Sequence, residues 1–312
     1  MFPVETAGSV LLGWAVGRND TAHIFGPAVA SQSLRYFHAL LLCALFVIAG
    51  SFLGSQAAFH TLASLSSQSV TTAFAASIAS AVTIFVMTML RLPASLSQIA
   101  IGSIIGISIA QGQVNATGLE TVFACWGFTP IMAACISLLI YKPVAHLFNK
   151  LPVTIFGQDK IIQICLVGTC CYAAYALGAN NVAGVMSVFV TSKVLPVLAA
   201  VFIGSMAIAA GALMCPKQSM FTVGSKLIRL DPFSAMIVVF SAALTVHFFA
   251  FVGVPVSTSQ AVTGAILGIG IMKGMQTIRL KTLLMMFVGW LCTPAVAGVL
   301  SFLLITLFLQ YT

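Results

Sequence analysis

Charged side chains are scarce in this chain. Of its 312 residues, 6% are Asp, Glu, Lys or Arg and 60% are hydrophobic. A soluble globular domain carries roughly 25% charged residues, because its surface must be hydrated on all sides. The composition therefore excludes a water-soluble globular protein. Apolar runs of about 20 residues recur from end to end, and each is long enough to cross a bilayer. We predict a multi-pass protein of the cell (inner) membrane.

The residues that most enzymes and metal sites require are also scarce. Only five residues are acidic, and Asp20 is the only one deep inside an apolar run, so no acid–base pair is available. The eight cysteines lie mostly in apolar runs and form no C-x-x-C pair. The net charge of +8 comes from basic residues in short loops, where they act as topology determinants. We expect no enzyme activity, no bound cofactor and no nucleic-acid partner.

The two halves of the chain repeat one pattern. Three short patterns recur in the same order about 160 residues further on: GRND (17–20) as GANN (178–181), PASLSQ (93–98) as PVSTSQ (255–260), and W-x-x-T-P at Trp126 as the same pattern at Trp290. Three ordered matches at nearly one spacing are not expected by chance. We therefore predict two copies of one unit, residues 1–150 and 151–312.

Each copy contains five apolar segments, which predicts an all-α polytopic membrane protein. The segments lie at about 4–30, 38–55, 70–91, 92–111 and 120–141 in the first copy, and at about 161–190, 194–214, 232–253, 254–275 and 283–309 in the second.

Loop charges predict the topology of these segments. Cytoplasmic loops carry an excess of Lys and Arg, and one orientation, with both termini outside, places all but one basic loop residue inside. The residues placed inside are Arg35, Arg91, Lys142, Lys150, Lys160, Lys217, Lys226, Arg229, Lys273, Arg279 and Lys281, and the exception is Lys193. Five crossings are an odd number, so the second copy is inverted relative to the first. Inverted repeats are typical of secondary transporters; parallel copies, the alternative, need an even number of crossings.

The fourth segment of each copy opens with polar residues. Proline suits the first turn of a helix, so the polar residues that follow it would cluster at a helix N-terminus. That end has free N–H groups and positive partial charge, which suit an anion. The residues are Ser95, Ser97 and Gln98 in the first copy and Ser257, Thr258, Ser259 and Gln260 in the second. The alternative is that small residues only permit tight helix packing.

The first segment of each copy is interrupted by polar residues as well. Arg18 and Asp20 lie within a span that should cross lipid, where an unpaired charge costs several kcal/mol. We predict a helix broken around Gly17 whose freed backbone faces a cavity. Two alternatives remain, a structural salt bridge between Arg18 and Asp20 and a loop at the membrane surface. The oxygen donors that suit a hard cation such as sodium are Asn19, Asp20, Asn180 and Asn181.

These patterns resemble the inorganic phosphate transporter (PiT) family, which includes sulfate permease-like members. Residues 178–183 (GANNVA) resemble its Gly-Ala-Asn-Asp-x-Ala-Asn motif, which occurs once in each half of that family. Residues 254–260 (VPVSTSQ) with 264–266 (GAI) resemble its Pro-Val-Ser-Thr-Thr-His…Gly-Ala-Ile stretch, and residues 222–226 and 230–232 resemble the loop before it. The resemblance covers nearly the whole chain in the family's order.

The resemblance implies a symporter that couples a tetrahedral oxyanion to a cation, with broken helices and hairpin-like segments near the membrane midplane. In that family the Asn-Asp motifs are associated with cation and substrate, and the Ser-Thr stretches at hairpin tips with the oxyanion. Carried over by position, the candidates are the residues already named: Asn19, Asp20, Asn180 and Asn181 for the cation, and the two Ser-rich clusters, with Gln98 and Gln260, for the anion.

The sequence departs from the family pattern at several positions. Arg18 replaces Ala, Asn181 replaces the second Asp, His23 and Gly184 replace the last Asn of the motif, and Gln98 and Gln260 replace His. We hypothesise that the Arg18 guanidinium takes over part of the role of bound sodium, since its fork geometry suits an oxyanion. His23 offers proton coupling as a second option, although a packed neutral histidine is the simpler interpretation.

The identity of the anion stays open at this point. Hydrogen phosphate carries a proton that needs an acceptor, whereas sulfate carries none, so one carboxylate in place of two leans towards sulfate. Asp20 is still able to accept that proton, and we predict phosphate first and sulfate as the alternative. The coupling ion is sodium or a proton, and homodimerisation is left open. A passive channel or an anion-binding membrane sensor is the alternative of another class.

Overall fold

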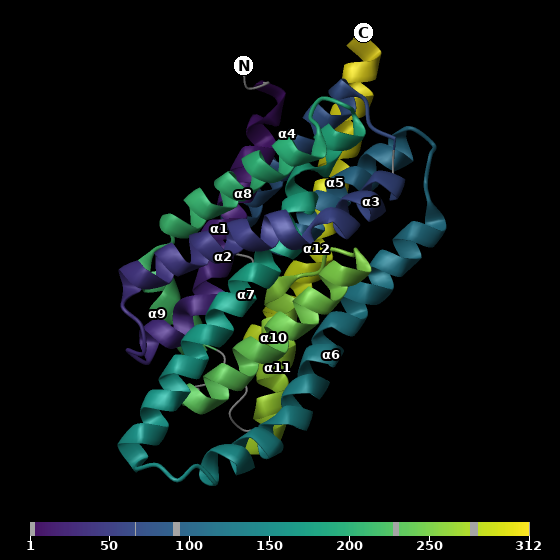
Figure 1. Cartoon of the computed structure of the whole chain (residues 1–312). Helices are drawn as coiled ribbons and strands as arrows, with labels where there is room; N and C mark the ends of the chain where they lie inside the picture. The colour runs from purple at the N-terminus through teal and green to yellow at the C-terminus, as the bar shows by residue number, and fades with distance from the viewer. Residues whose placement is uncertain (1–3, 66, 90–93, 227–230, 275–279, 312) are drawn as a thin grey trace.

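The structure is a computed structural model that describes residues 4–65, 67–89, 94–226, 231–274 and 280–311. Arg91, Pro93, Arg229 and Arg279, on which the sequence analysis drew, lie outside these residues. The described elements are all helical (Figure 1): η1 (Val4–Thr6), α1 (Ala7–Ala30), α2 (Tyr36–Gly54), α3 (Gln56–Leu65), α4 (Val70–Met89), α5 (Leu96–Ala110), α6 (Ala116–Asn149), α7 (Ile155–Thr191), α8 (Val197–Leu213), α9 (Lys217–Lys226), α10 (Pro232–Val252), α11 (Thr258–Lys273) and α12 (Leu280–Tyr311).

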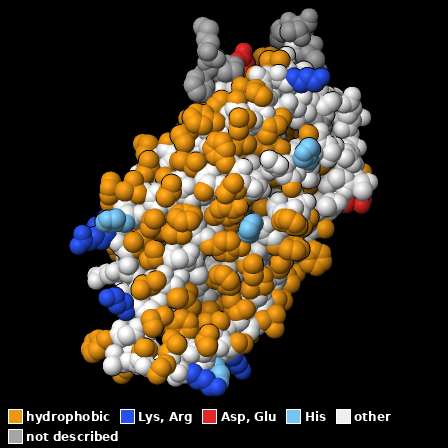
Figure 2. All heavy atoms as spheres, in the orientation of Figure 1, with side chains coloured by type: hydrophobic (Ala, Val, Ile, Leu, Met, Phe, Trp, Pro, Cys, Tyr) orange, Lys and Arg blue, Asp and Glu red, His pale blue; other side chains and the backbone are white. Residues whose placement is uncertain are grey.

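The ten predicted segments are confirmed as helices, and two short helices are added to them. Helix α3 follows α2, and its counterpart α9 follows α8, in stretches that the sequence analysis treated as loops. Within the described residues, six helices are long and apolar enough to cross a membrane, namely α2, α4, α6, α7, α10 and α12. Figure 2 shows hydrophobic side chains over most of the visible face, with Lys and Arg at its periphery. This is the surface of a multi-pass membrane protein.

Helix α1 runs without interruption through the polar stretch that contains Gly17. The prediction of a break there is wrong, and so is the alternative of a surface loop. Gly17 lies where α1 crosses α8, and a Cβ atom at this position would be only 1.8 Å from the carbonyl oxygen of Ile208. The glycine therefore permits the close approach of two helices, a use of small residues that is common in membranes, and it does not end the helix.

The two halves pack against each other through reciprocal contacts of this kind. A Cβ would come within 2.0 Å of a facing carbonyl oxygen at four glycines: Gly17 against Ile208 and Gly211 against Trp14 where α1 crosses α8, and Gly178 against Val47 and Gly50 against Tyr175 where α7 crosses α2. The same reciprocity joins α5 to α12 and α11 to α6, through Gly102 at Pro294 and Gly264 at Pro130. The two halves thus contact each other through equivalent helix surfaces, as two-fold symmetry requires.

The repeated first helices, α1 and α7, run antiparallel. Gly13, early in α1, lies against Val185 near the end of α7. Later in α1, the Ile24 carbonyl accepts a hydrogen bond from Cys170 Sγ, early in the buried part of α7, at 3.1 Å. The beginning of α1 and the end of α12 also lie at one end of the molecule, and the connection between α6 and α7 lies at the other (Figure 1). Both observations agree with inverted repeats.

Helices α5 and α11 begin inside the protein. With 15 and 16 residues they are about 22–24 Å long at 1.5 Å per residue, which is shorter than the hydrocarbon layer. Their first residues are buried, and so is the turn 253–257 between α10 and α11. This turn starts at Gly253, whose φ of 90° suits glycine. The N-termini of the two helices therefore lie in the interior of the protein. This agrees with the prediction of hairpin-like segments near the membrane midplane.

The open end of the α10–α11 hairpin is closed by an ion pair. Lys273 Nζ donates to Asp231 Oδ2, and Asp231 also caps α10 by accepting from the Ser234 N–H at 2.9 Å. Partial burial acts to raise the pKa of Asp231, but the Lys273 and Ser234 contacts outweigh it and hold that pKa below its ordinary value. The hairpin is thereby fixed at its base, which leaves its buried turn as the part that reaches the interior.

Candidate functional site

The N-terminus of α5 and the buried turn before α11 meet at Ser97. The Ser97 hydroxyl lies 2.9 Å from the Val256 carbonyl oxygen, in the turn that leads into α11, and 2.8 Å from Asn181 Oδ1 of α7. A hydroxyl has one proton to donate, yet two acceptors face it here. All three residues are buried. The Ser97 hydroxyl, the Asn181 side-chain oxygen and the Val256 carbonyl are neutral oxygen ligands of the kinds that a hard cation accepts.

Asn180 holds the same turn through its side-chain amide. Its Nδ2 donates to the Val256 carbonyl at 2.8 Å, and its Oδ1 accepts from the Val256 N–H at 2.9 Å. The turn cannot use helical hydrogen bonds at this point, and a buried peptide group without partners is costly. Asn180 therefore fixes the tip of the α10–α11 hairpin to α7.

Asp20 of α1 lies on the other side of this hairpin tip. It is the only charged residue that is buried in the part of the chain that the structure describes. Its Oδ1 accepts from Asn19 Nδ2 at 2.9 Å, and the Thr258 side chain at the first turn of α11 lies near it without forming a hydrogen bond. The predicted residues Asn19, Asp20, Thr258, Asn180, Asn181 and Ser97 thus come together around the start of α11.

The remaining serines of the two Ser-rich clusters lie at the N-termini of the short helices. Ser95 precedes α5, is 2% exposed, and its hydroxyl has no hydrogen-bond partner in the described protein. Ser257 precedes α11, and its Oγ lies 2.9 Å from Ser259 Oγ. Two helix N-termini with hydroxyl groups therefore face the interior, where their positive partial charge is little screened. Such an arrangement suits an oxyanion.

Arg18 lies outside this cluster. Its side chain is exposed, and the guanidinium carbon is 5.0 Å from the centre of the Trp14 ring. Among the described residues the ion pair joins Lys273 and Asp231, so the alternative of a structural salt bridge between Arg18 and Asp20 is wrong. The Arg18 backbone nitrogen lies close to Gly211, in the last turn of α8, where a cation interacts favourably with the free carbonyl groups of a helix end.

His23 lies beside the cluster but faces apolar residues. It lines a cavity of about 10 Å³ together with Thr258 and side chains of α7 and α10 such as Ala173 and Val246. A cavity of this size holds about one water molecule. His247, the other histidine of this region, accepts or donates a hydrogen bond with the Tyr172 hydroxyl at 2.8 Å, which gives it a structural partner.

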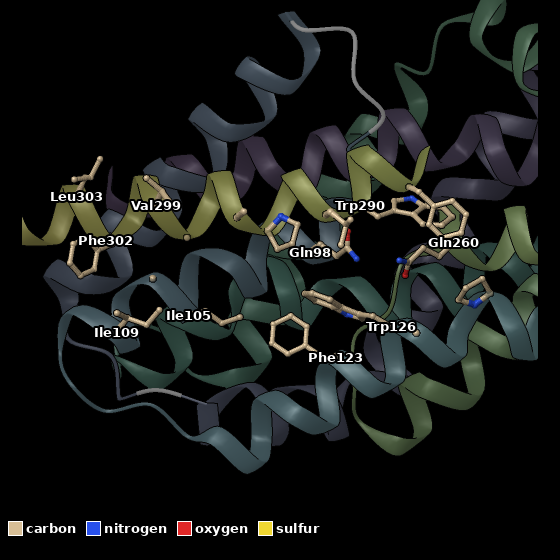
Figure 3. A pocket seen from close by; sticks show the side chains of 18 residues that line it. Gln98, Ile105, Ile109, Phe123, Trp126, Gln260, Trp290, Val299, Phe302 and Leu303 are labelled. Carbon is tan, nitrogen blue, oxygen red and sulfur yellow. The ribbon is translucent and has the colours of Figure 1, made fainter. Parts of the chain in front are cut away.

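Gln98 and Gln260 are placed differently from their serine neighbours. Both side chains line a cavity of about 870 Å³ between α5, α6, α11 and α12, and they point towards each other across it (Figure 3). Successive helix residues are about 100° apart, so Gln98 faces another direction than Ser97. Of the predicted site residues, these two and Arg18 are the ones that the structure separates from the group around Asp20.

The sequence analysis missed one component of the site, the backbone of Val256. Its peptide N–H and carbonyl oxygen contact Asn180 and Ser97, and an apolar side chain gives no sign of such a role. Its place between Pro255 and the N-cap residue Ser257 was the available signal, because the backbone just before a helix has no helical hydrogen bonds.

Comparison with known proteins identifies the relatives of this arrangement. A profile of the phosphate transporter family matches the chain twice, over residues 16–160 and again over residues 156–301. The chain belongs to the phosphate transporter family. The double match agrees with the duplication inferred from the repeated GRND/GANN and PASLSQ/PVSTSQ patterns and confirms the resemblance stated from the sequence.

Individual members of the family resemble the chain over nearly its whole length. The putative phosphate permease MJ0630 of Methanocaldococcus jannaschii is 30% identical over 96% of this chain and 96% of its own length. The sulfate permease CysP of Bacillus subtilis is 27% identical over 97% of this chain and 86% of its own. A solved structure titled as a sodium-dependent phosphate transporter superimposes with a TM-score of 0.88 at 18% identity, covering 99% of this chain and 98% of that one. The last match shows the common fold.

Proposed function

We propose that the chain is a symporter that moves inorganic phosphate across the cell membrane together with sodium ions or protons. The observation that carries the proposal is the meeting of two hydroxyl-bearing helix N-termini at Ser97 and Val256, next to the buried carboxylate of Asp20. Helix N-termini and hydroxyl groups bind a tetrahedral oxyanion without adding net charge. The proposed anion ligands are Ser95, Ser97, Ser257, Thr258 and Ser259.

The charges of the site favour coupling to a cation. Among the described residues, no Lys or Arg is buried and Asp20 is the only buried anionic group. Two like unit charges 4 Å apart repel each other by about 4 kcal/mol at an effective dielectric constant of 20. A phosphate dianion beside ionised Asp20 therefore needs a cation that enters with it. A passive channel has no such requirement, so the buried carboxylate favours the symporter over the channel.

Sodium is the coupling ion that the oxygen geometry favours. Ser97 Oγ, Asn181 Oδ1 and the Val256 carbonyl oxygen converge around one hydroxyl proton, and the Asn181 amide orientation is fixed by its Nδ2 donating to Leu177 O at 3.2 Å. Neutral oxygens of these three kinds are ligands that hard cations accept. Asn19 and Asp20 are the equivalent residues of the first half, and they are the proposed ligands of a second sodium ion. Coupling to protons through Asp20 and His23 is the alternative.

Sulfate is the second candidate substrate, and one residue favours it. Asn181 stands where the resembling family motif has a second Asp, so the site has one carboxylate in place of two. Hydrogen phosphate needs an acceptor for its proton and sulfate does not. The similarity to the sulfate permease CysP over 97% of this chain makes this alternative specific enough to test beside phosphate.

Three further proposals accompany the transport function. The exposed Arg18 attracts the anion at the edge of α8 and α1, a steering role in place of direct contact in the buried site. The connection between α6 and α7 with Lys150, and the adjoining helix ends with Lys142 and Lys160, face the cytoplasm. Because the beginning of α1 and the end of α12 lie opposite this connection (Figure 1), both termini face outside.

Purified protein in liposomes tests the proposal. Labelled phosphate and labelled sulfate are supplied outside, each with an inward sodium gradient, an inward proton gradient or neither. We expect saturable phosphate uptake that an inward sodium gradient stimulates. Sulfate uptake without phosphate uptake would select the second candidate. Binding of either anion without flux in any gradient would identify an anion sensor and contradict the transport function.

A further inference from the structure

A large apolar cavity lies away from the Asp20 site. Its volume is about 870 Å³, and its walls come from α5, α6, α11 and α12. Two matching aromatic pairs from the two halves, Phe123 with Trp126 and Phe287 with Trp290, pack edge to face at its inner end. Towards the other end the lining is mostly aliphatic and includes Ile109 and Leu303, together with Phe302 (Figure 3).

The mouth of the cavity faces the hydrocarbon layer. Large apolar lining residues remain half exposed on α6 and α12, including Phe123 at 50%, Val299 at 59% and Leu303 at 50%. Both helices are among the candidate membrane spans. None of the described residues that line the cavity is charged. A charged anion is therefore not its ligand, because an unpaired charge is strongly disfavoured in such surroundings.

Two buried glutamines at the inner end of the cavity have side-chain oxygens without a partner. Gln98 is 2% exposed and Gln260 is 5% exposed, and the Oε1 atom of each has no hydrogen-bond partner in the described protein. Both side chains point into the cavity from opposite walls (Figure 3). Water does not reach this position from the hydrocarbon side, and a buried amide oxygen without a partner is destabilising.

The chemistry of the lining defines the ligand. The long aliphatic wall fits an apolar chain, and the two amides require a partner that donates and accepts hydrogen bonds. Each glutamine amide offers N–H donors and a carbonyl acceptor. A hydroxyl group satisfies both functions, whereas a plain acyl chain satisfies neither.

We propose that this cavity binds a neutral lipid amphiphile, with its hydroxyl-bearing head between Gln98 and Gln260 and its apolar chain along α5 and α12. The ligand enters sideways from the bilayer between α6 and α12. It is bound independently of the transported anion, whose proposed ligands lie around Asp20.

Tryptophan fluorescence reports on this cavity directly. The chain has three tryptophans, and two of them, Trp126 and Trp290, line the cavity. A Trp14→Phe variant keeps only these two. In bilayers of dibrominated phosphatidylcholine we expect bromine to quench their emission, because brominated chains enter the cavity. Hexadecanol should then displace the brominated chains and restore emission at a mole fraction about tenfold lower than hexadecane, since two neutral hydrogen bonds contribute about 0.5–1.5 kcal/mol each.

The glutamines provide the decisive comparison. In a Gln98→Leu/Gln260→Leu double variant of Trp14→Phe, the preference for hexadecanol over hexadecane should disappear while bromine quenching persists. Gln163→Leu, an exposed position on α7, is the matched control and should keep the preference. Thermal unfolding of each variant checks that it folds. Three results would each overturn the proposal: no quenching by brominated lipid, equal displacement by the two probes, or an unchanged preference in the double variant. The first would indicate that a second copy of the chain covers the cavity.

Discussion

Asn180 and Val256 are joined by two hydrogen bonds, from Asn180 Nδ2 to the Val256 carbonyl at 2.8 Å and from the Val256 N–H to Asn180 Oδ1 at 2.9 Å. The symmetry of the two halves is broken at this contact. Its counterpart in the first half is Asn19, which is exposed and donates to Asp20. The hairpin of the second half is therefore fixed to α7, and the carboxylate of the site belongs to the first half alone.

Replacing Asn180 should release the hairpin tip. Asn180→Ala leaves the N–H and carbonyl of Val256 buried without partners, which costs about 1–3 kcal/mol for each group. We expect a lower thermal unfolding midpoint and loss of uptake. Asn180→Asp keeps the acceptor for the N–H but repels the carbonyl, so its effect should be equally severe. Asn149→Ala, an exposed position at the end of α6, is the control. Normal uptake by Asn180→Ala would show that the contact has no functional role.

Ser97 should affect the affinity for the coupling cation. Ser97→Ala removes one of the three converging oxygens, and losing a ligand interaction of about 1.4 kcal/mol raises the half-saturating sodium concentration about tenfold. Ser103→Ala is the matched control, because Ser103 is buried in the same helix and bonds to Ser80 Oγ at 3.0 Å. Sodium titration of uptake in liposomes measures both. A similar shift in the two variants would mean that only helix packing was disturbed.

The number of carboxylates in the site should set the strength of coupling. Asp20→Asn removes the only charge that is buried among the described residues, and we expect uptake that no longer responds to the cation gradient. Asn181→Asp adds a carboxylate next to Ser97, and we expect a stronger sodium dependence because like charges near the site must be neutralised before an anion binds. Uptake is measured at several sodium concentrations. If the sodium dependence of uptake is unchanged in both variants, or rises in Asp20→Asn and falls in Asn181→Asp, these residues do not set the coupling to sodium.

The glycines at the helix crossings should be sensitive to a single methyl group. In Gly17→Ala and Gly178→Ala the new Cβ would lie 1.8 and 2.0 Å from a backbone carbonyl oxygen, so the crossing helices must move apart. Overpacking of this kind costs about 1–3 kcal/mol or more. Gly168→Ala, with nothing within 4 Å of its Cβ, should be neutral or stabilising by helix propensity. Thermal unfolding in detergent compares the three variants, and equal midpoints would contradict the crossing geometry.

Much of the fold could be predicted because the chain contains its pattern twice. The repeated Pro-x-Ser-x-Ser-Gln stretches predicted two buried helix starts, and α5 and α11 confirm them. The role of Gly17 could not be predicted from its neighbours, since a glycine beside charged residues is common both at a break and at a close helix crossing. Its partner, Ile208, lies in the other half of the chain, where no local pattern identifies it.

The candidate site could be predicted only in part for a similar reason. Ser97 and Asn181 were candidates by residue type, and the structure brings them within 2.8 Å of each other. The backbone of Val256 was missed because its contribution does not depend on its side chain. Gln98 is polar like Ser97, but the turn of the helix directs it into the apolar cavity, and this direction follows only from how α5 packs.

Cation-driven accumulation of the anion tests the central claim most directly. Liposomes are loaded with labelled phosphate at the same concentration inside and outside, and an inward sodium gradient is then imposed. The account predicts net accumulation of phosphate inside by the unaltered protein and none by Asp20→Asn. Accumulation by both proteins, or equilibration by both at a rate independent of sodium, would contradict a site in which the buried carboxylate couples the cation to the anion.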